Sequence, residues 1–390
     1  MLQLPNELQF QRKSKNRLNS VDSLARFLGL TRDQLIQTAN LNFKYKKKNI
    51  PKKNGNRRII HKPCSAIRHA QSLINSRFIK PMVIWPNYVY GCIPNTIDNT
   101  SNTIRKDYIA CAQQHCRAKS VAHIDIENFF DNISEYHINS IFTDFFKCGP
   151  EVSENLTKLV CNEGTLVQGA LTSSYLATLL FHKLEPLIVY RFKSKGIKYT
   201  RLIDDITLST HKKDYEFKSE IESIKRMLNS YDLNMNEDKL SLDFFSSKPI
   251  YVHNLRVDHN NPRYSKEEVR RIRTLVKNIM SQSQTPNYRT EITYRKDYYR
   301  CMGTVNKLSL TNHYYHKKFI RKIVRIKPLP SKKDIYNTDI FITKLESTSK
   351  HDRNLYHFIK RKNIALNRVY LIRKIYKHEA KKLLDRLNAV

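Results

Sequence analysis

The amino-acid sequence predicts an α+β fold, with helices at both ends of the chain and alternating strands and helices between them. Residues 120–130 and 199–209 each contain a short run of β-branched and apolar residues, which is typical of a buried strand. Residues 168–192 lie between these runs and have the apolar spacing of one long helix. Basic segments with helical spacing follow from residue 265 and again over residues 351–390.

The remaining elements follow in chain order from local signals. Residues 1–45 read as helices, one of which begins at the capping residue Ser20. A basic segment with strand-like arms surrounds Asn54 and Gly55, which predicts a hairpin. Further expected elements are a helix over residues 66–82, a helix over about 214–230, a hairpin over 249–260, a helix that starts with the capping pair Ser265 and Glu268, and a linker over 325–334.

Positive charge is the strongest feature of the composition. The 390 residues include 70 Lys and Arg against 35 Asp and Glu, which gives a net charge of +35. Because repulsion of this size favours a polyanionic partner, we expect nucleic acid, although a ribosome-associated protein or a generally basic proteome would also fit the charge. The sequence has no apolar stretch of membrane-spanning length and no signal-peptide core, so we expect no membrane partner and a cytoplasmic location.

Cysteine and glycine usage argues against several classes of site. None of the seven cysteines forms a CxxC pair, so we do not expect a zinc knuckle. We expect free thiols in a reducing compartment. The chain has eight glycines, and neither GxxxxGK[ST] nor GxGxxG occurs. If the protein handles nucleoside triphosphates, metal ions and Lys or Arg side chains must hold the phosphates.

Two adjacent aspartates, Asp204 and Asp205, interrupt an otherwise apolar, strand-like run. Two like charges resist burial, whereas a divalent cation such as Mg²⁺ would remove the conflict and would prefer carboxylate ligands. Asp125, at the end of the other strand candidate, could supply a third carboxylate. The alternative is that the pair is a plain turn dipeptide.

Five motifs in this order resemble those of bacterial reverse transcriptases, over roughly residues 40–325. They are KKNGNRRIIHKP (52–63), DIENFFDNIS (125–134), LVQGALTSSYLATLL (166–180), YTRLIDDITLS (199–209) and LNMNEDKL (233–240). Several positions depart from the family pattern: Leu202 replaces the Tyr of YxDD, and Val167, Leu171 and Ser174 replace prolines around the QG motif.

Two further segments resemble elements of the retron class and its defence-associated relatives. CAQQH (111–115) resembles the NAxxH element, with Cys111 in place of Asn. VHN (252–254) lies where retrons carry VTG, with His253 and Asn254 in place of Thr and Gly. These departures leave open a reverse transcriptase of the wider defence-associated group.

The resemblance implies a right-hand polymerase. Its expected parts are an N-terminal helical region (1–45), fingers (46–116), palm (117–248), palm end and thumb (249–325) and a basic helical C-terminal extension (326–390).

The resemblance also implies roles for individual residues. The catalytic residues would be Asp125, Asp204 and Asp205, and the ligands of two Mg²⁺ ions would be these three and Ile126. Nucleotide binding would involve Lys53, Arg58, Phe130, Gln168 and Lys239. RNA binding would involve His115, Val252, His253, Asn254, Arg270 and Arg273. Phe130 would act as the gate that excludes a 2′-hydroxyl, the alternative being a core phenylalanine, and His115 has an RNA-binding or a structural role.

The implied activity is RNA-directed DNA synthesis from dNTPs on a noncoding RNA template, in antiphage defence. An effector protein or second subunit is a further expected partner. The alternatives are a non-retron defence enzyme that makes repetitive, untemplated or protein-primed DNA, and a noncatalytic RNA-binding scaffold.

Overall fold

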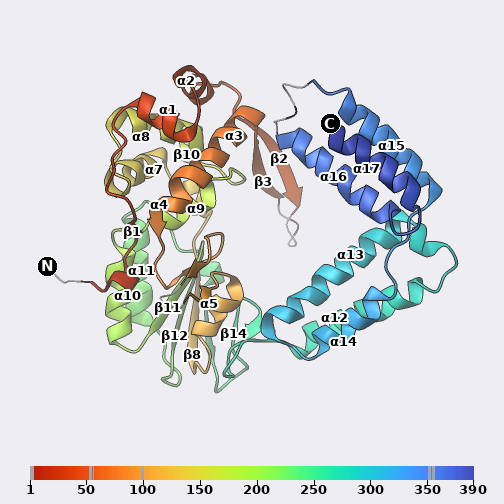
Figure 1. Cartoon of the computed structure of the whole chain (residues 1–390). Helices are drawn as coiled ribbons and strands as arrows, with labels where there is room; N and C mark the ends of the chain where they lie inside the picture. The colour runs from red at the N-terminus through yellow and green to blue at the C-terminus, as the bar shows by residue number, and fades with distance from the viewer. Residues whose placement is uncertain (1–3, 52–54, 56, 98–100, 350–352, 354–355) are drawn as a thin grey trace. The chain divides into compact units, whose positions relative to one another are not determined.

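The computed structural model describes residues 4–390 apart from 52–54, 56, 98–100, 350–352 and 354–355 (Figure 1). The chain divides into two compact units, residues 1–262 and 263–390. The finer division into fingers, palm and thumb stays a prediction.

A five-stranded sheet forms the lower part of the first unit in the view of Figure 1. Its strands, in spatial order, are β13 (Ser241–Phe244), β8 (Ser120–Asp125), β12 (Asp205–Thr210), β11 (Lys198–Leu202) and β5 (Val89–Tyr90). Neighbouring strands are antiparallel except β11 and β5, which are parallel. Both predicted strand segments are therefore confirmed, and the second one folds as the hairpin β11–β12.

The helices of the first unit share one apolar core with this sheet, and that core runs from Leu8 to Met235. They are α1 (Val21–Leu28), α2 (Arg32–Ala39), α3 (Ser65–Leu73), α4 (Lys80–Met82), α5 (Tyr108–Gln114), α6 (Phe129–Asn132), α7 (Glu135–Ser140), α8 (Pro150–Val160), α9 (Ser173–Leu179), α10 (Glu185–Ser194) and α11 (Lys218–Asn229). Ser20 caps α1 as predicted, because its side chain accepts a hydrogen bond from the N–H of Ser23. Between α3 and α4, residues Ile74–Ile79 form a π-helical stretch, and a second one covers Ile141–Phe145.

The single helix expected over residues 168–192 is wrong. The structure has two helices there, α9 and α10, separated by a turn. Pro186 lies in the first turn of α10. Proline has no N–H to donate, and inside a helix its ring clashes with the carbonyl of the residue four positions earlier. Proline is therefore favoured in the first turn of a helix and disfavoured in its interior.

Short antiparallel pairs complete the first unit. They are β1 (Gln11–Arg12) with β4 (Val83–Ile84), β2 (Tyr45–Pro51) with β3 (Arg57–Pro63), β6 (Thr96–Ile97) with β7 (Thr103–Ile104), β9 (Cys161–Asn162) with β10 (Thr165–Leu166), and β14 (Tyr251–Val252) with β15 (Leu255–Arg256). The two predicted hairpins are thus confirmed, although Asn54 lies outside the described residues.

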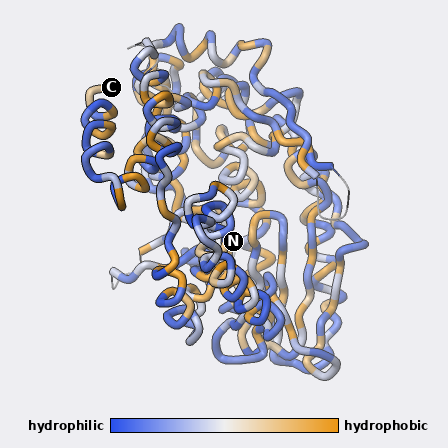
Figure 2. The backbone as a smooth tube through the Cα atoms, turned by 90° about the vertical axis from the view of Figure 1, so that its right-hand side faces the viewer, coloured by the Kyte–Doolittle hydropathy of each residue, from blue (hydrophilic) through white to orange (hydrophobic). Residues whose placement is uncertain are grey.

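The second unit is helical and has two separate cores. One core lies among α12 (Lys266–Gln282), α13 (Ile292–Lys307) and α14 (Tyr315–Val324), and the other among α15 (Lys332–Glu346), α16 (Tyr356–Ile372) and α17 (Lys377–Ala389); a short strand, β16 (Arg263–Tyr264), precedes them. Ser265 caps α12, and the predicted apolar face of that helix is buried at Val269, Ile272, Val276 and Ile279. Along the helices near the C-terminus, hydrophilic and hydrophobic residues alternate (Figure 2), as expected for amphipathic helices that share a core.

Candidate active site

The sheet brings the predicted carboxylates together. Asp125, the last residue of β8, pairs directly with Asp205, the first residue of β12. Asp204 precedes it in a two-residue turn, since Leu202 pairs with Asp205. The carbonyl of Asp204 accepts a hydrogen bond from the N–H of Ile126, at 3.3 Å. Three carboxylates from two neighbouring strands therefore meet at one end of the sheet.

The turn that carries Asp204 has an unfavourable backbone conformation. Ile203 has a φ of +63°, a left-handed conformation in which a β-branched residue is strained. Arg201 supports the turn, because its Nη1 donates a hydrogen bond to the carbonyl of Ile203 at 3.1 Å. Asp204 is thus a turn residue and Asp205 a strand residue, which gives the two carboxylates different positions.

Arg201 is itself held by a buried ion pair with Glu185. Both side chains are fully buried; Arg201 Nε lies 2.5 Å from Glu185 Oε1, and Nη2 lies 2.8 Å from Oε2. Tyr199 donates a further hydrogen bond to Glu185 at 2.7 Å. No sequence motif marks this pair, and the available signal is that each charge interrupts an apolar run. We regard Arg201 and Glu185 as positioning residues for the Asp204 turn.

The electrostatics of the site reflect three acidic groups in partial burial. Burial raises the pKa of Asp205 to about 6, and repulsion from Asp204 and Asp125 adds to the effect. Burial also raises the pKa of Asp204. Lys239 opposes this repulsion, since its Nζ lies 2.7 Å from Asp125 Oδ2.

The donor set fits a hard divalent cation. The available ligands are carboxylate oxygens, which such ions prefer. Burial first and repulsion second raise the pKa values of Asp204 and Asp205, and a cation would oppose both effects. The side chain of Ile126 is buried, so this residue could contribute only its main-chain carbonyl. Within the described part of the chain, no three His, Cys, Asp or Glu side chains form a preassembled metal site.

The hairpin β2–β3 contacts the segment around the QG motif. The N–H of His61 donates to the carbonyl of Gln168 at 2.8 Å. Gly169 has a φ of +113°, and a Cβ at this position would lie 2.6 Å from the carbonyl oxygen of His61. Only glycine therefore allows this close approach of the two backbones.

The predicted nucleotide-binding residues differ in what the structure says of them. Arg58 is exposed on β3, and its charge acts to lower the pKa of Asp204, which indicates that it lies near the acidic site. Phe130 is half-buried against the core, whereas the neighbouring Phe129 is fully packed. Lys53 lies outside the described residues. The roles of Arg58, Phe130, Gln168 and Lys239 in nucleotide binding stay predictions.

Two of the predicted RNA-binding residues are buried. His115 is fully buried, with Nδ1 2.7 Å from Ser209 Oγ and Nε2 2.7 Å from Thr200 Oγ1. The side chain of Val252 is also fully buried. Direct contact of either side chain with RNA does not agree with this burial, and the structural role expected as an alternative for His115 agrees with it.

The other predicted RNA-binding residues reach the surface in different degrees. His253 and Asn254 form the turn between β14 and β15; His253 is partly buried and Asn254 is exposed. In the second unit, Arg270 and Arg273 are exposed on α12, and the guanidinium of Arg273 lies 4.8 Å from the ring centre of Tyr315.

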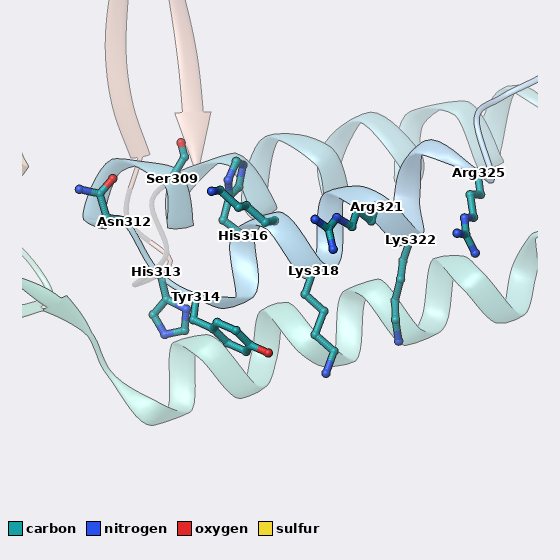
Figure 3. A pocket seen from close by; sticks show the side chains of 10 residues that line it. Ser309, Asn312, His313, Tyr314, His316, Lys318, Arg321, Lys322 and Arg325 are labelled. Atoms are coloured by element: carbon teal, nitrogen blue, oxygen red, sulfur yellow. The ribbon is translucent and has the colours of Figure 1, made fainter.

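A basic pocket lies on α14 and the turn before it, within the second unit (Figure 3). It has a volume of about 1030 Å³ and is lined by Ser309, Asn312, His313, Tyr314, His316, Lys317, Lys318, Arg321, Lys322 and Arg325. The lining contains no acidic residue, and Tyr314 is 76% exposed. Cations beside an exposed aromatic ring are the combination that binds phosphates and stacks on bases.

Among the described residues, no helix is both long enough and apolar enough to cross a membrane.

The sequence of the chain matches known proteins over most of its length. Residues 50–269 match the family described as reverse transcriptase (RNA-dependent DNA polymerase). The chain is 39% identical to the retron Ec48 reverse transcriptase of Escherichia coli over 90% of this chain and 86% of that protein. It is 32% identical to the retron Se72 reverse transcriptase of Salmonella heidelberg over 86% of this chain and 85% of that protein.

Solved structures add a weaker likeness. The apo telomerase of Candida tropicalis matches with a TM-score of 0.41 and 10% identity, over 88% of this chain and 64% of that one, which is too low to carry an argument. The family match and the two retron relatives confirm the right-hand polymerase that the five motifs predicted. The chain therefore belongs to the retron-type bacterial reverse transcriptases and is an RNA-directed DNA polymerase.

Proposed function

We propose that Asp125, Asp204 and Asp205 are the catalytic residues of this polymerase and that they bind two Mg²⁺ ions, with the carbonyl of Ile126 as a further ligand. The observation that carries the proposal is the register of the sheet, in which Asp125 lies directly opposite Asp205 and beside the turn of Asp204. These carboxylates would hold the ions, which would supply Lewis acidity toward a primer 3′-hydroxyl and positive charge for the leaving pyrophosphate.

The reaction joins the primer 3′-oxygen to the α-phosphorus of a dNTP and breaks the bond from that phosphorus to the bridging oxygen of pyrophosphate. Arg58 and Lys239 are available to hold the negatively charged triphosphate, with Lys53 as a further candidate. Gln168 would position the template or the nucleotide, and Phe130 would pack against the sugar.

We further propose that the template is a structured noncoding RNA and that the protein acts in antiphage defence in the cytoplasm. The net charge of +35 supports a nucleic-acid partner, and so does the basic pocket on α14. An effector protein or second subunit would complete the system. No observation favours the alternative of a non-retron enzyme, because the relatives that cover most of the chain are retron reverse transcriptases.

The test is the double variant Asp204→Asn and Asp205→Asn in primer extension on an RNA template with Mg²⁺. We expect a folded protein whose dNTP incorporation falls by several orders of magnitude, because ligands of the ions are lost. Asp33→Asn, an exposed carboxylate on α2, is the matched control and should keep normal activity. Incorporation near the wild-type rate by the double variant would contradict the catalytic assignment.

A further inference from the structure

We propose that Cys111 and His253 form a matched pair of positioning residues, which fixes the turn between β14 and β15 and thereby presents Asn254 to the RNA partner. The pair itself follows from contacts within the first unit. Its consequence for RNA selection rests on the proposed function.

The turn needs support from outside its own backbone. Val252 pairs with Leu255, so His253 and Asn254 are its two central residues. Both have left-handed backbones, with φ of 49° and 63°. Asparagine adopts this conformation readily, whereas histidine does so less easily. A tertiary contact of the His253 side chain would stabilise the turn.

Cys111 supplies that contact from α5. Its Sγ lies 3.3 Å from His253 Nε2 and 3.2 Å from Thr200 Oγ1, and the cysteine is fully buried. Thr200 in turn contacts His115 Nε2 at 2.7 Å, and His115 Nδ1 contacts Ser209 at 2.7 Å. A continuous polar chain therefore links the turn to β11 and β12, the strands on either side of the Asp204 turn.

Donor and acceptor numbers match along the whole chain, and the direction in which Cys111 donates to Thr200 satisfies every contact. A thiol has a single proton, so if Cys111 donates to Thr200 it must accept from His253 Nε2–H. Thr200 then donates to His115 Nε2, and His115 donates to Ser209 from Nδ1. Every contact is satisfied when both imidazoles are neutral. Burial supports this state, since it lowers the pKa of His253 to about 4 and the pKa of His115 well below its usual value.

The pair also explains two departures from the retron pattern together. Cys111 stands where the retron element has Asn, and His253 where it has Thr. Cysteine and asparagine are nearly equal in size, whereas histidine is larger than threonine, so the two exchanges are linked by their contact and not by a cancellation of volume. The structure shows that the exchanged residues touch. Exchange of one partner alone would leave the other facing a group of different shape and hydrogen-bonding pattern.

This arrangement separates two residues that were expected to act together. The His253 side chain faces the protein and Asn254 is exposed. We therefore assign the RNA contact to Asn254 and the support of the turn to His253 and Cys111.

The experiment is a double-mutant cycle with Cys111→Asn, His253→Thr and the combination of both. The probe is the RNA that copurifies with the wild-type protein, identified by sequencing and remade by transcription. An unrelated structured RNA of the same length is measured at the same salt concentration. We expect each single variant to lower the preference for the copurifying RNA about tenfold and the double variant to return within about threefold of wild type. Asn254→Ala should lose the preference without rescue, and Cys92→Ser, at an exposed thiol, is the control.

Losses that simply add in the double variant would overturn the matched pair, and an unchanged preference in Asn254→Ala would overturn the role of the turn. Melting temperatures provide the same cycle without RNA, with a drop in each single variant and recovery in the double. The wild type could show no preference for any RNA while the double variant still recovers its melting temperature. That result would contradict the proposed RNA partner and support the pairing of Cys111 with His253.

Discussion

The buried pair of Glu185 and Arg201 allows stability and activity to be separated by mutation. Glu185→Gln keeps the shape of the side chain and removes its charge. The guanidinium of Arg201 then stays fully buried without a counter-charge. The NH2 group of the new glutamine can also face the N–H donors of Arg201, which leaves donor against donor. We expect the variant to be destabilised and its turn at Asp204 to be disturbed.

The size of the effect follows from the burial of the pair. Both side chains are 0% exposed and share two hydrogen bonds. Breaking such a pair from one side costs about 3–5 kcal/mol of unfolding free energy, because a buried charge is left uncompensated. That is a large part of the 5–15 kcal/mol by which a typical domain is stable.

A double variant tells us what Arg201 does beyond this pairing. Glu185→Leu with Arg201→Met replaces both charges by apolar groups, an exchange that is often neutral or stabilising. It also removes the donor to the carbonyl of Ile203, at 3.1 Å, and the donor to the carbonyl of Thr178, at 2.8 Å. Each loss costs about 1 kcal/mol. The double exchange also leaves the buried hydroxyl of Tyr199 without its acceptor, Glu185. The double variant should therefore regain part of the stability but little of the polymerase activity.

Denaturant unfolding and primer extension on the same samples provide the measurements. Arg32→Gln, which removes an ion pair exposed to solvent at both partners, is the control and should leave the unfolding midpoint nearly unchanged. If Glu185→Gln unfolds within about 1 kcal/mol of wild type, the buried charge is not stabilised by Glu185 as described. If the double variant extends primers at the wild-type rate, Arg201 does not position the Asp204 turn.

Three further predictions concern single residues. Phe130→Val should allow rNTPs to compete with dNTPs by removing bulk beside the sugar; an unchanged ratio of rNTP to dNTP incorporation would make Phe130 a core residue. Gly169→Ala should lower activity in primer extension, because its Cβ would lie 2.6 Å from the His61 carbonyl, and full activity would disprove the close approach. Burial lowers the pKa of His115 well below 6.5 in the folded protein. Below pH 6.5 the unfolded chain takes up a proton at His115 while the folded protein does not, so the stability that His115 contributes is complete above pH 6.5 and falls as the pH drops below it. The melting temperature of His115→Asn should consequently depend less on pH below 6.5 than that of wild type, with His211→Gln, at an exposed histidine, as the control; equal pH dependence would contradict it.

The acidic site was predictable from the sequence because its signals are local. Runs of β-branched and apolar residues predict β8, β11 and β12, and the three aspartates lie at or directly beside the ends of these strands. The structure has two helices where one was expected over residues 168–192. The spacing of apolar residues continues through the turn between them and therefore does not reveal it. Pro186 was the available signal for the start of α10.

Contacts between distant parts of the chain could not be predicted in this way. Cys111 and His253 are 142 positions apart, and Glu185 and Arg201 come from a helix and a strand of different patterns. No periodicity encodes which buried polar groups will meet. His115 illustrates the point, because a motif indicated that it matters and only the fold shows that it faces Thr200 and Ser209.

The pairing of Asp125 with Asp205 sets a trade-off between stability and function. Like charges directly opposite in an antiparallel sheet are destabilising. Burial raises the pKa of Asp205, and repulsion from Asp204 and Asp125 adds to this effect. A sequence selected for the stable fold alone would avoid this pair, which agrees with the catalytic role proposed for it. In the absence of divalent ions, the inactive double asparagine variant should for this reason melt at a higher temperature than the active enzyme.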